Sequence, residues 1–139
     1  MDGTPWARAD AEARSADQVR HWREHGFGWR AAADRATGEL VGLMALSRAD
    51  GLTPGVPAGE HEIGWWLDPA VWGRGLAREG AAAIRDEAFA LGATTIVARI
   101  QPENTASIAV AEALGLRREL ASTGRVGEPL LVYRLARAA

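Results

Sequence analysis

The sequence contains no cysteine and no lysine, and each absence removes a kind of chemistry. Without cysteine, the chain forms no disulfide, no thiolate metal site and no thiolate nucleophile. Because all 16 basic residues are arginine, a lysine nucleophile or Schiff base is excluded as well. Covalent catalysis through sulfur or through an amine side chain is therefore ruled out.

The chain also lacks a strong charge and a long apolar run. Its formal net charge is −2 and its pI is about 5.9, so no general basic field attracts nucleic acid. No apolar run approaches the roughly 20 residues that span a bilayer, and the N-terminus has no signal-peptide core. We expect no nucleic-acid or membrane partner and a cytoplasmic location. The length of 139 residues, 47% of them hydrophobic, predicts one α/β domain over residues 1–139.

Hydrophobic periodicity and turn residues predict alternating helices and strands. Residues 1–14 show little periodicity and are expected to form a poorly ordered lead-in. We expect helices at residues 16–25, 75–91 and 104–114, and strands at residues 27–33, 39–46, 62–67, 94–100, 116–121 and 129–135. Strand 62–67, the helix after it and strand 94–100 have the order of a parallel, right-handed pair.

The segment from Arg48 to Gly59 is rich in glycine and proline and is predicted to be a surface loop. It is longer than an ordinary hairpin connection. Two interpretations stay open: a solvated excursion, or a border of a binding cleft.

The turn Trp72-Gly73-Arg74-Gly75-Leu76-Ala77 is the strongest candidate for a binding site. Glycines on both sides of an arginine, just before a helix, leave main-chain N–H groups uncovered and pointing one way. The positive end of the helix dipole adds to this, so the turn is suited to a phosphate group. The alternative is that the glycines only let a strand enter a helix tightly.

A second candidate lies at the start of the helix predicted for residues 104–114. Asn104 and Ser107 are three residues apart and are therefore neighbours on one helix face. Asn104 by itself is also explained as a helix N-cap, but a cap does not explain Ser107.

In this order and spacing, the motifs in residues 60–119 resemble the core of a GNAT N-acetyltransferase, in the branch similar to ribosomal-protein-alanine acetyltransferases. The matching segments are Glu62-Ile63-Gly64-Trp65-Trp66-Leu67, Trp72 to Ala77, Asn104-x-x-Ser107 and Ala113-Leu114-Gly115-Leu116, with Phe27-Gly28-Trp29 and residues 37–42 upstream. The resemblance implies a mixed, mostly antiparallel sheet with a splayed parallel strand pair and helices on both faces.

The resemblance also implies acetyl-CoA as co-substrate and no metal. Main-chain amides of the glycine turn would hold the pyrophosphate, and main-chain groups of the preceding strand would pair with pantetheine like an added strand. The residues implied for this binding are Trp66, Leu67, Trp72, Gly73, Arg74, Gly75, Leu76, Ala77, Arg78, Asn104 and Ser107.

The expected reaction moves an acetyl group to a primary amine, of a protein N-terminus or a small molecule, by direct transfer. The amine must be neutral to attack, and Glu62 is the best candidate for its base, acting through water, with Glu60 and His61 beside it. In many relatives a tyrosine assists the departing thiolate. Its place here is Ala111, and Ser107 is the substitute that we name.

The chain departs from the family pattern at its front, where the first family strand and helix have little room. We therefore expect strand 27–33 to be a bare edge, and predict a homodimer or a compensating segment from residues 1–14. The short front and Ala111 favour an alternative function: a degenerate GNAT domain that serves as an acetyl-CoA-binding or protein-interaction module. His21 and His25 have metal-ligand spacing without a third ligand, which favours a solvated helix face.

Overall fold

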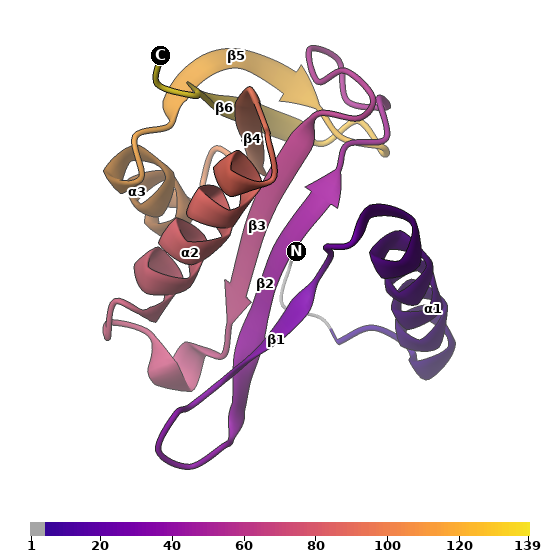
Figure 1. Cartoon of the computed structure of the whole chain (residues 1–139), viewed down its shortest axis with the longest axis vertical. Helices are drawn as coiled ribbons and strands as arrows, with labels where there is room; N and C mark the ends of the chain where they lie inside the picture. Colours follow the sequence, from indigo (N-terminus) through magenta and orange to yellow (C-terminus); the bar gives the residue numbers. More distant parts are fainter. Residues whose placement is uncertain (1–4) are drawn as a thin grey trace.

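The computed structural model describes residues 5–139, which form a mixed sheet with helices packed against it (Figure 1). The sheet order is β1-β2-β3-β4-β6-β5. The elements are α1 (Arg8–His25), β1 (Arg30–Ala33), β2 (Leu40–Arg48), β3 (His61–Leu67), a 3-10 turn (Pro69–Val71), α2 (Leu76–Ala90), β4 (Thr95–Ile100), α3 (Thr105–Ala113), β5 (Arg117–Thr123) and β6 (Pro129–Ala136). The α/β class expected from the sequence is confirmed.

One strand pair in this sheet is parallel, and it is incomplete. β3 and β4 pair only at His61 with Ile96 and at Glu62 with Val97, whereas the other neighbouring strands pair antiparallel. β3 continues to Leu67 and β4 continues to Ile100, but the two strands make no further pairs with each other. The splayed parallel pair predicted from the sequence is therefore present.

The two faces of β3 have different surroundings because successive strand residues point to opposite faces. Ile63, Trp65 and Leu67 belong to the main core, which also contains residues of α2 and α3. Glu62 and Trp66 lie on the opposite face. In Figure 1, α2 and α3 cover the same side of the sheet, and α1 lies beside β1 at the edge. We call the side of α2 and α3 the helix face.

Helix α2 packs closely on the sheet because its inner residues are small or apolar at helical spacing. Ala81, Ile84 and Ala88 are its buried residues. A Cβ atom built at Gly80 meets the end of the Met44 side chain at 2.5 Å, so a larger residue at position 80 would require the Met44 side chain to move.

The loop between β2 and β3 packs against the opposite face of the sheet. Val56 is buried with Val97 and Val132, and the side chain of Thr53 is buried too. The loop is therefore not the solvated excursion that was one of the two interpretations.

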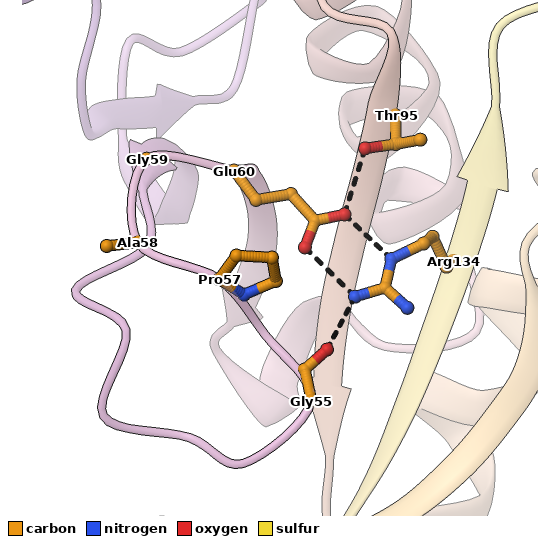
Figure 2. Close-up of a pocket in the computed structure, with 7 residues that line it drawn as sticks. All are labelled: Gly55, Pro57, Ala58, Gly59, Glu60, Thr95 and Arg134. Carbon is orange, nitrogen blue, oxygen red and sulfur yellow. Dashed lines mark hydrogen bonds and ion pairs between the residues drawn. The ribbon is translucent and has the colours of Figure 1, made fainter.

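An ion pair fixes the end of this loop to the sheet (Figure 2). Arg134 of β6 donates to Glu60 through Nε at 2.7 Å and through Nη2 at 2.9 Å. The same Nη2 donates to the carbonyl oxygen of Gly55 at 2.8 Å, and the Thr95 hydroxyl donates to Glu60 at 2.9 Å. The loop, β4 and β6 are thus joined through two largely buried side chains.

The first helix is longer than the sequence predicted. It begins at Arg8, so the expected lead-in is wrong for residues 8–14, and residues 1–4 lie outside the described part of the chain. Arg8 and Glu12 form an ion pair one turn apart, but no residue of α1 is buried. A polar helix of this kind gives no hydrophobic period from which its start can be read.

The strand expected at residues 27–33 begins only at Arg30. Before it, side chains of α1 form hydrogen bonds with the main chain of Trp29. The main-chain N–H of Trp29 donates to the Gln18 side chain at 3.2 Å, and the Trp22 indole donates to the Trp29 carbonyl at 2.9 Å. Side chains of α1 thus take the place of a partner strand at Trp29.

The sequence favoured a solvated helix face for His21, and the structure shows that this is wrong. Its Nε2 accepts a hydrogen bond from the main-chain N–H of Arg48 at 3.0 Å, and its Nδ1 lies 2.7 Å from the carbonyl oxygen of Phe27. The acceptor role of Nε2 matches a donor role for Nδ1, and the ring joins α1 to β2.

Candidate functional site

A cavity of about 1010 Å³ lies where β3 and β4 separate. Its walls are the end of β3, the turn after it and the first turns of α2 and α3. Of the predicted site residues, the structure brings together Trp66, Leu67, Trp72, Gly73, Gly75, Leu76, Ala77, Arg78, Asn104 and Ser107. Glu62 and Arg74 do not line it. The sequence analysis missed the further lining residues Pro5, Trp6, Trp65, Pro69, Val71, Gln101, Glu103, Ala106 and Val110.

The turn before α2 leaves its main-chain N–H groups free. Gly73 and Gly75 have φ angles of 80° and 74°, a backbone conformation that residues with a side chain rarely adopt. No atom lies within 4 Å of a Cβ built on either glycine. No N–H from Gly73 to Arg78 donates a hydrogen bond within the described residues. Because these donors sit at the start of a helix beside a cavity, they can bind an anion.

The two arginines of the turn lie differently. Arg78 lines the cavity. Arg74 points to the β1–β2 turn, where its Nη2 lies 3.6 Å from the Asp34 carboxylate. Hydrogen bonds from the main-chain N–H groups of Ala36 and Thr37 lower the pKa of Asp34, and Arg74 adds to this effect. Arg78 is therefore the better placed of the two to meet a ligand in the cavity.

The ladder with β2 decides which main-chain groups of β3 face the gap. Asp68 N–H bonds to Val41 and Ala49 N–H bonds to Glu60, so the even-numbered residues of β3 pair with β2. The N–H and C=O of Trp66 thus point to β2, and those of Trp65 and Leu67 point to the gap. Trp65 was missed because the alternation depends on the register, which the sequence does not display.

The expectation that the main chain of Trp66 pairs with a ligand is therefore corrected. The Trp66 side chain lines the cavity, but its main chain is bonded to β2. The carbonyl oxygen of Leu67 accepts a hydrogen bond from the Trp72 indole at 2.9 Å. Trp72 therefore braces the end of β3 against the glycine turn.

Asn104 has the N-cap role that was considered for it, and it also lines the cavity. Its Oδ1 accepts the main-chain N–H of Ser107 at 3.2 Å, which leaves its NH2 group free for a ligand. Ala111, one turn further along α3, is fully buried in the main core. Among the residues of this helix face, Ser107 is the hydroxyl that reaches the cavity.

Glu62 lies on the sheet face away from the helices, in an ion pair. Arg99 donates to Glu62 at 2.8 Å and to the Thr53 hydroxyl at 2.7 Å. Burial raises the pKa of Glu62, and the charge of Arg99 works against this rise. Asp50 and Glu60 repel the carboxylate and raise the pKa further. Glu62 therefore has the raised pKa that suits a general base.

The neighbours of Glu62 are less suited to act as a base. Both carboxylate oxygens of Glu60 are bonded to Arg134, and its side chain is only 8% exposed. His61 is buried and stacked on Phe27, with a ring-centroid distance of 5.5 Å. Burial and then Arg48 lower the pKa of His61.

Three tryptophans line up on the same sheet face as Glu62; we call Trp6, Trp29 and Trp66 the tryptophan row. Ring centroids of Trp29 and Trp66 lie 5.5 Å apart, and those of Trp6 and Trp29 lie 6.4 Å apart. The Trp29 indole donates to the hydroxyl of Ser47, the residue paired with Glu62. Because Trp6 and Trp66 line the cavity together with residues of the helix face, the cavity passes through the gap in the sheet.

Comparisons with known proteins bear on the family of this chain. The model of the acetyltransferase (GNAT) domain family matches residues 1–117. The chain belongs to the GNAT acetyltransferase family. Transfer of an acetyl group from acetyl-CoA is the general reaction of this family.

Individual relatives of this GNAT chain span different shares of it. The uncharacterized N-acetyltransferase YnaD of Bacillus subtilis is 42% identical over 64 residues, which cover 44% of this chain and 38% of YnaD. The chain thus matches less than half the length of that relative. The solved acetyltransferase from Agrobacterium tumefaciens str. C58 is 32% identical, with a TM-score of 0.79, and the match covers 97% of this chain and 75% of that one.

More distant solved structures share the fold of this GNAT chain. The Salmonella typhimurium protein yncA, solved with its cofactor acetyl-CoA, has a TM-score of 0.73 at 23% identity, covering 92% of this chain and 76% of that one. Solved ribosomal-protein-alanine acetyltransferases from Vibrio fischeri and Brucella melitensis, 19% and 20% identical to this chain, share the fold too.

Two further features bear on what else the GNAT chain could bind. A second cavity of about 540 Å³ lies beside the Glu60–Arg134 pair in Figure 2, but the charged groups there already bond to each other. Within residues 5–139 no three His, Cys, Asp or Glu side chains gather as metal ligands, and no helix is long and apolar enough to cross a membrane.

Proposed function

We propose that this chain transfers the acetyl group of acetyl-CoA to a primary amine, of a protein N-terminus or of a small molecule. The observation that carries the proposal is the set of free N–H groups from Gly73 to Arg78 beside a cavity that crosses the sheet. Such donors suit the pyrophosphate, and the gap between β3 and β4 suits the narrow pantetheine arm. Membership of the GNAT family supports the same substrate.

Binding then follows from the groups that line the cavity. The amides of the glycine turn and the Arg78 side chain hold the pyrophosphate. The free main-chain groups of Trp65 and the N–H of Leu67 pair with pantetheine, as a longer β4 would otherwise do, while the Leu67 carbonyl stays bonded to the Trp72 indole. The NH2 group of Asn104 donates to a pantetheine carbonyl, and Ser107 lies next to the arm.

The transfer needs few side chains. The amine nitrogen attacks the thioester carbonyl carbon, a C–N bond forms and the C–S bond breaks. A main-chain N–H of β3 stabilises the oxygen that becomes negative. The proton lost by the amine passes through water to Glu62. The thiolate leaves with a hydrogen bond from the Ser107 hydroxyl and takes up one proton from solvent, which balances the one released.

A second function is a GNAT fold that binds acetyl-CoA without turnover, as an interaction module. Two observations favour it. Ala111 occupies the place of the acid found in many relatives and is buried, and Glu62 is held by Arg99.

One pair of measurements separates the two functions. Thiol release from acetyl-CoA is followed with a panel of primary amines and N-terminal peptides, and the melting temperature is followed with coenzyme A. We expect a concentration-dependent rise in melting temperature and thiol release with at least one amine. A rise without release on any amine supports the binding module, and no rise contradicts both functions.

A further inference from the structure

We propose that the acceptor carries an apolar group, aromatic or branched, next to its amine, and that this group packs against the tryptophan row. The inference rests on the proposed transfer, because it concerns the half of the same cavity that lies beyond the gap. The occupant to which we commit is a primary amine with a large apolar substituent.

The position of the row identifies it as an acceptor wall. Trp6 and Trp66 line the cavity on the face opposite α2 and α3, and the two residues are 40% and 36% exposed. The amides proposed to hold the substrate's pyrophosphate belong to the turn before α2. With the thioester in the gap between β3 and β4, the amine must come from the opposite side, where the row is.

The row is held in place by polar contacts at its back and rim. The Trp29 indole bonds to Ser47 at 3.0 Å, and the Arg14 guanidinium lies 4.3 Å from the centre of the Trp6 ring. Trp29 also contacts both other rings. A wall fixed in this way offers rigid aromatic surface, which costs little conformational entropy when a ligand binds.

The charged groups near this half of the cavity are engaged in contacts within the protein, including Arg14, which lies over the Trp6 ring. Glu62 lies on the same sheet face as the row, and it is paired with Arg99 at 2.8 Å. Arg99 is also bonded to Thr53, so two of its nitrogens are in use. The lining residues of this half are Pro5, Trp6 and Trp66, and none of them is charged. Recognition beside the amine therefore depends on apolar contact.

The test compares three acceptors that share an α-amino group and a terminal amide: L-alaninamide, L-phenylalaninamide and the α-amide of L-glutamic acid. We expect kcat/KM for phenylalaninamide to exceed that for alaninamide by about 10- to 100-fold, as is typical of a large apolar group in a fitted pocket. Equal values, or preference for the glutamic acid amide, would overturn the inference.

Variants of Trp6 connect such a preference to the row. Trp6→Ala is expected to reduce the ratio of the two kcat/KM values by about tenfold, mainly through the phenylalaninamide value. Trp6→Phe keeps an aromatic wall and is expected to retain most of the ratio. If both variants keep the full ratio, the phenyl group binds elsewhere and the inference is wrong.

A binding measurement keeps the inference testable if no amine is acetylated. In the ¹⁵N-labelled protein with coenzyme A, phenylalaninamide should shift the indole N–H signals of Trp6 and Trp66, and alaninamide should not. Trp22 does not line the cavity and serves as the internal control. Identical small shifts with both amines overturn the inference. Failure of coenzyme A to bind contradicts the proposed function instead, and the indole shifts are then read without it.

Discussion

Gly75 is the residue at which backbone conformation and proposed chemistry coincide. Its φ of 74° suits glycine, and the N–H groups around it are free. We predict that Gly75→Ala costs about 1–2 kcal/mol of stability because of the positive φ, and also weakens coenzyme A binding by disturbing the anion site. Gly75→Glu, which adds a negative charge, should abolish binding. Isothermal titration with coenzyme A measures the affinity.

Gly92 supplies a matched control for this experiment. It has a φ of 96°, no atom lies within 4 Å of its built Cβ, and it ends α2 far from the turn. Gly92→Ala should therefore show a similar loss of stability with unchanged affinity. If Gly75→Ala and Gly92→Ala bind coenzyme A equally well, the glycine turn is not the pyrophosphate site.

Arg99 is a neighbour of Glu62 that opposes the rise in its pKa, and this leads to a prediction about pH. Burial raises the pKa of Glu62, whereas Arg99 lowers it. Removal of the cation in Arg99→Gln should raise the pKa further. Because a base acts when deprotonated, the acid limb of kcat/KM should move to higher pH in the variant.

Rates of acetyl transfer measured against pH, with one amine for both proteins, test this expectation. The ionisation of the amine is then the same in each profile, so any displacement belongs to the protein. An acid limb at the same pH in both proteins would exclude Glu62 as the base.

Residues whose role is local were predictable from the sequence, and those defined by long-range contacts were not. Gly73, Gly75 and Asn104 carry turn and cap signals within a few positions. Trp6 reaches the cavity only through the packing of the N-terminal segment. The bond from Arg99 to Thr53 joins residues 46 positions apart, and no local pattern indicates it.

At the scale of elements, the β2–β3 loop depends on the ion pair between Glu60 and Arg134. Their side chains are 8% and 16% exposed. Glu60 and Glu119 raise the pKa of Arg134, so it stays charged at every ordinary pH. We predict that Arg134→Gln lowers the free energy of unfolding by about 3–5 kcal/mol, because Glu60 is left buried without its partner. Urea unfolding measures the loss.

The same loop offers a surface pair for comparison. Arg125 contacts Asp50, with side chains 69% and 35% exposed. Arg125→Gln should cost less than about 1 kcal/mol, since exposed pairs contribute little. Equal losses for the two variants would mean that burial does not strengthen the Arg134 pair.

Element types were predictable where hydrophobic periodicity was clear, as in α2 and β4. The start of α1 was not, because a polar helix carries no such period and its first residues looked unstructured. Packing of the β2–β3 loop was missed because its glycines and prolines also suit a solvated loop. Only the contact of Val56 with Val97 and Val132 reveals that it covers the sheet.

At the scale of the whole molecule, β1 is an edge strand within the described part of the chain. The main-chain N–H and C=O groups of Arg30 and Ala32 point to β2, so those of Ala31 point outward. The homodimer expected from the sequence stays a prediction, and this edge is where we expect it to form. Ala31→Pro removes the outward N–H without breaking the ladder to β2, and should give a monomer.

Size-exclusion chromatography with light scattering measures the mass of each variant. Ala31→Val keeps the N–H and favours a strand, so it should remain dimeric. A wild-type mass of one chain at every concentration would show that the homodimer prediction is wrong.

The parting of β3 from β4 has a consequence for solvent exchange. Deep in a sheet, the amide hydrogens of Trp65 and Leu67 have no strand to shield them, whereas those of Gly64 and Trp66 bond to β2. In deuterated water the first two should therefore exchange quickly and the second two slowly, which gives an alternating pattern along one strand. A pantetheine arm paired with β3 as proposed would slow exchange at Trp65 and Leu67 and remove the alternation.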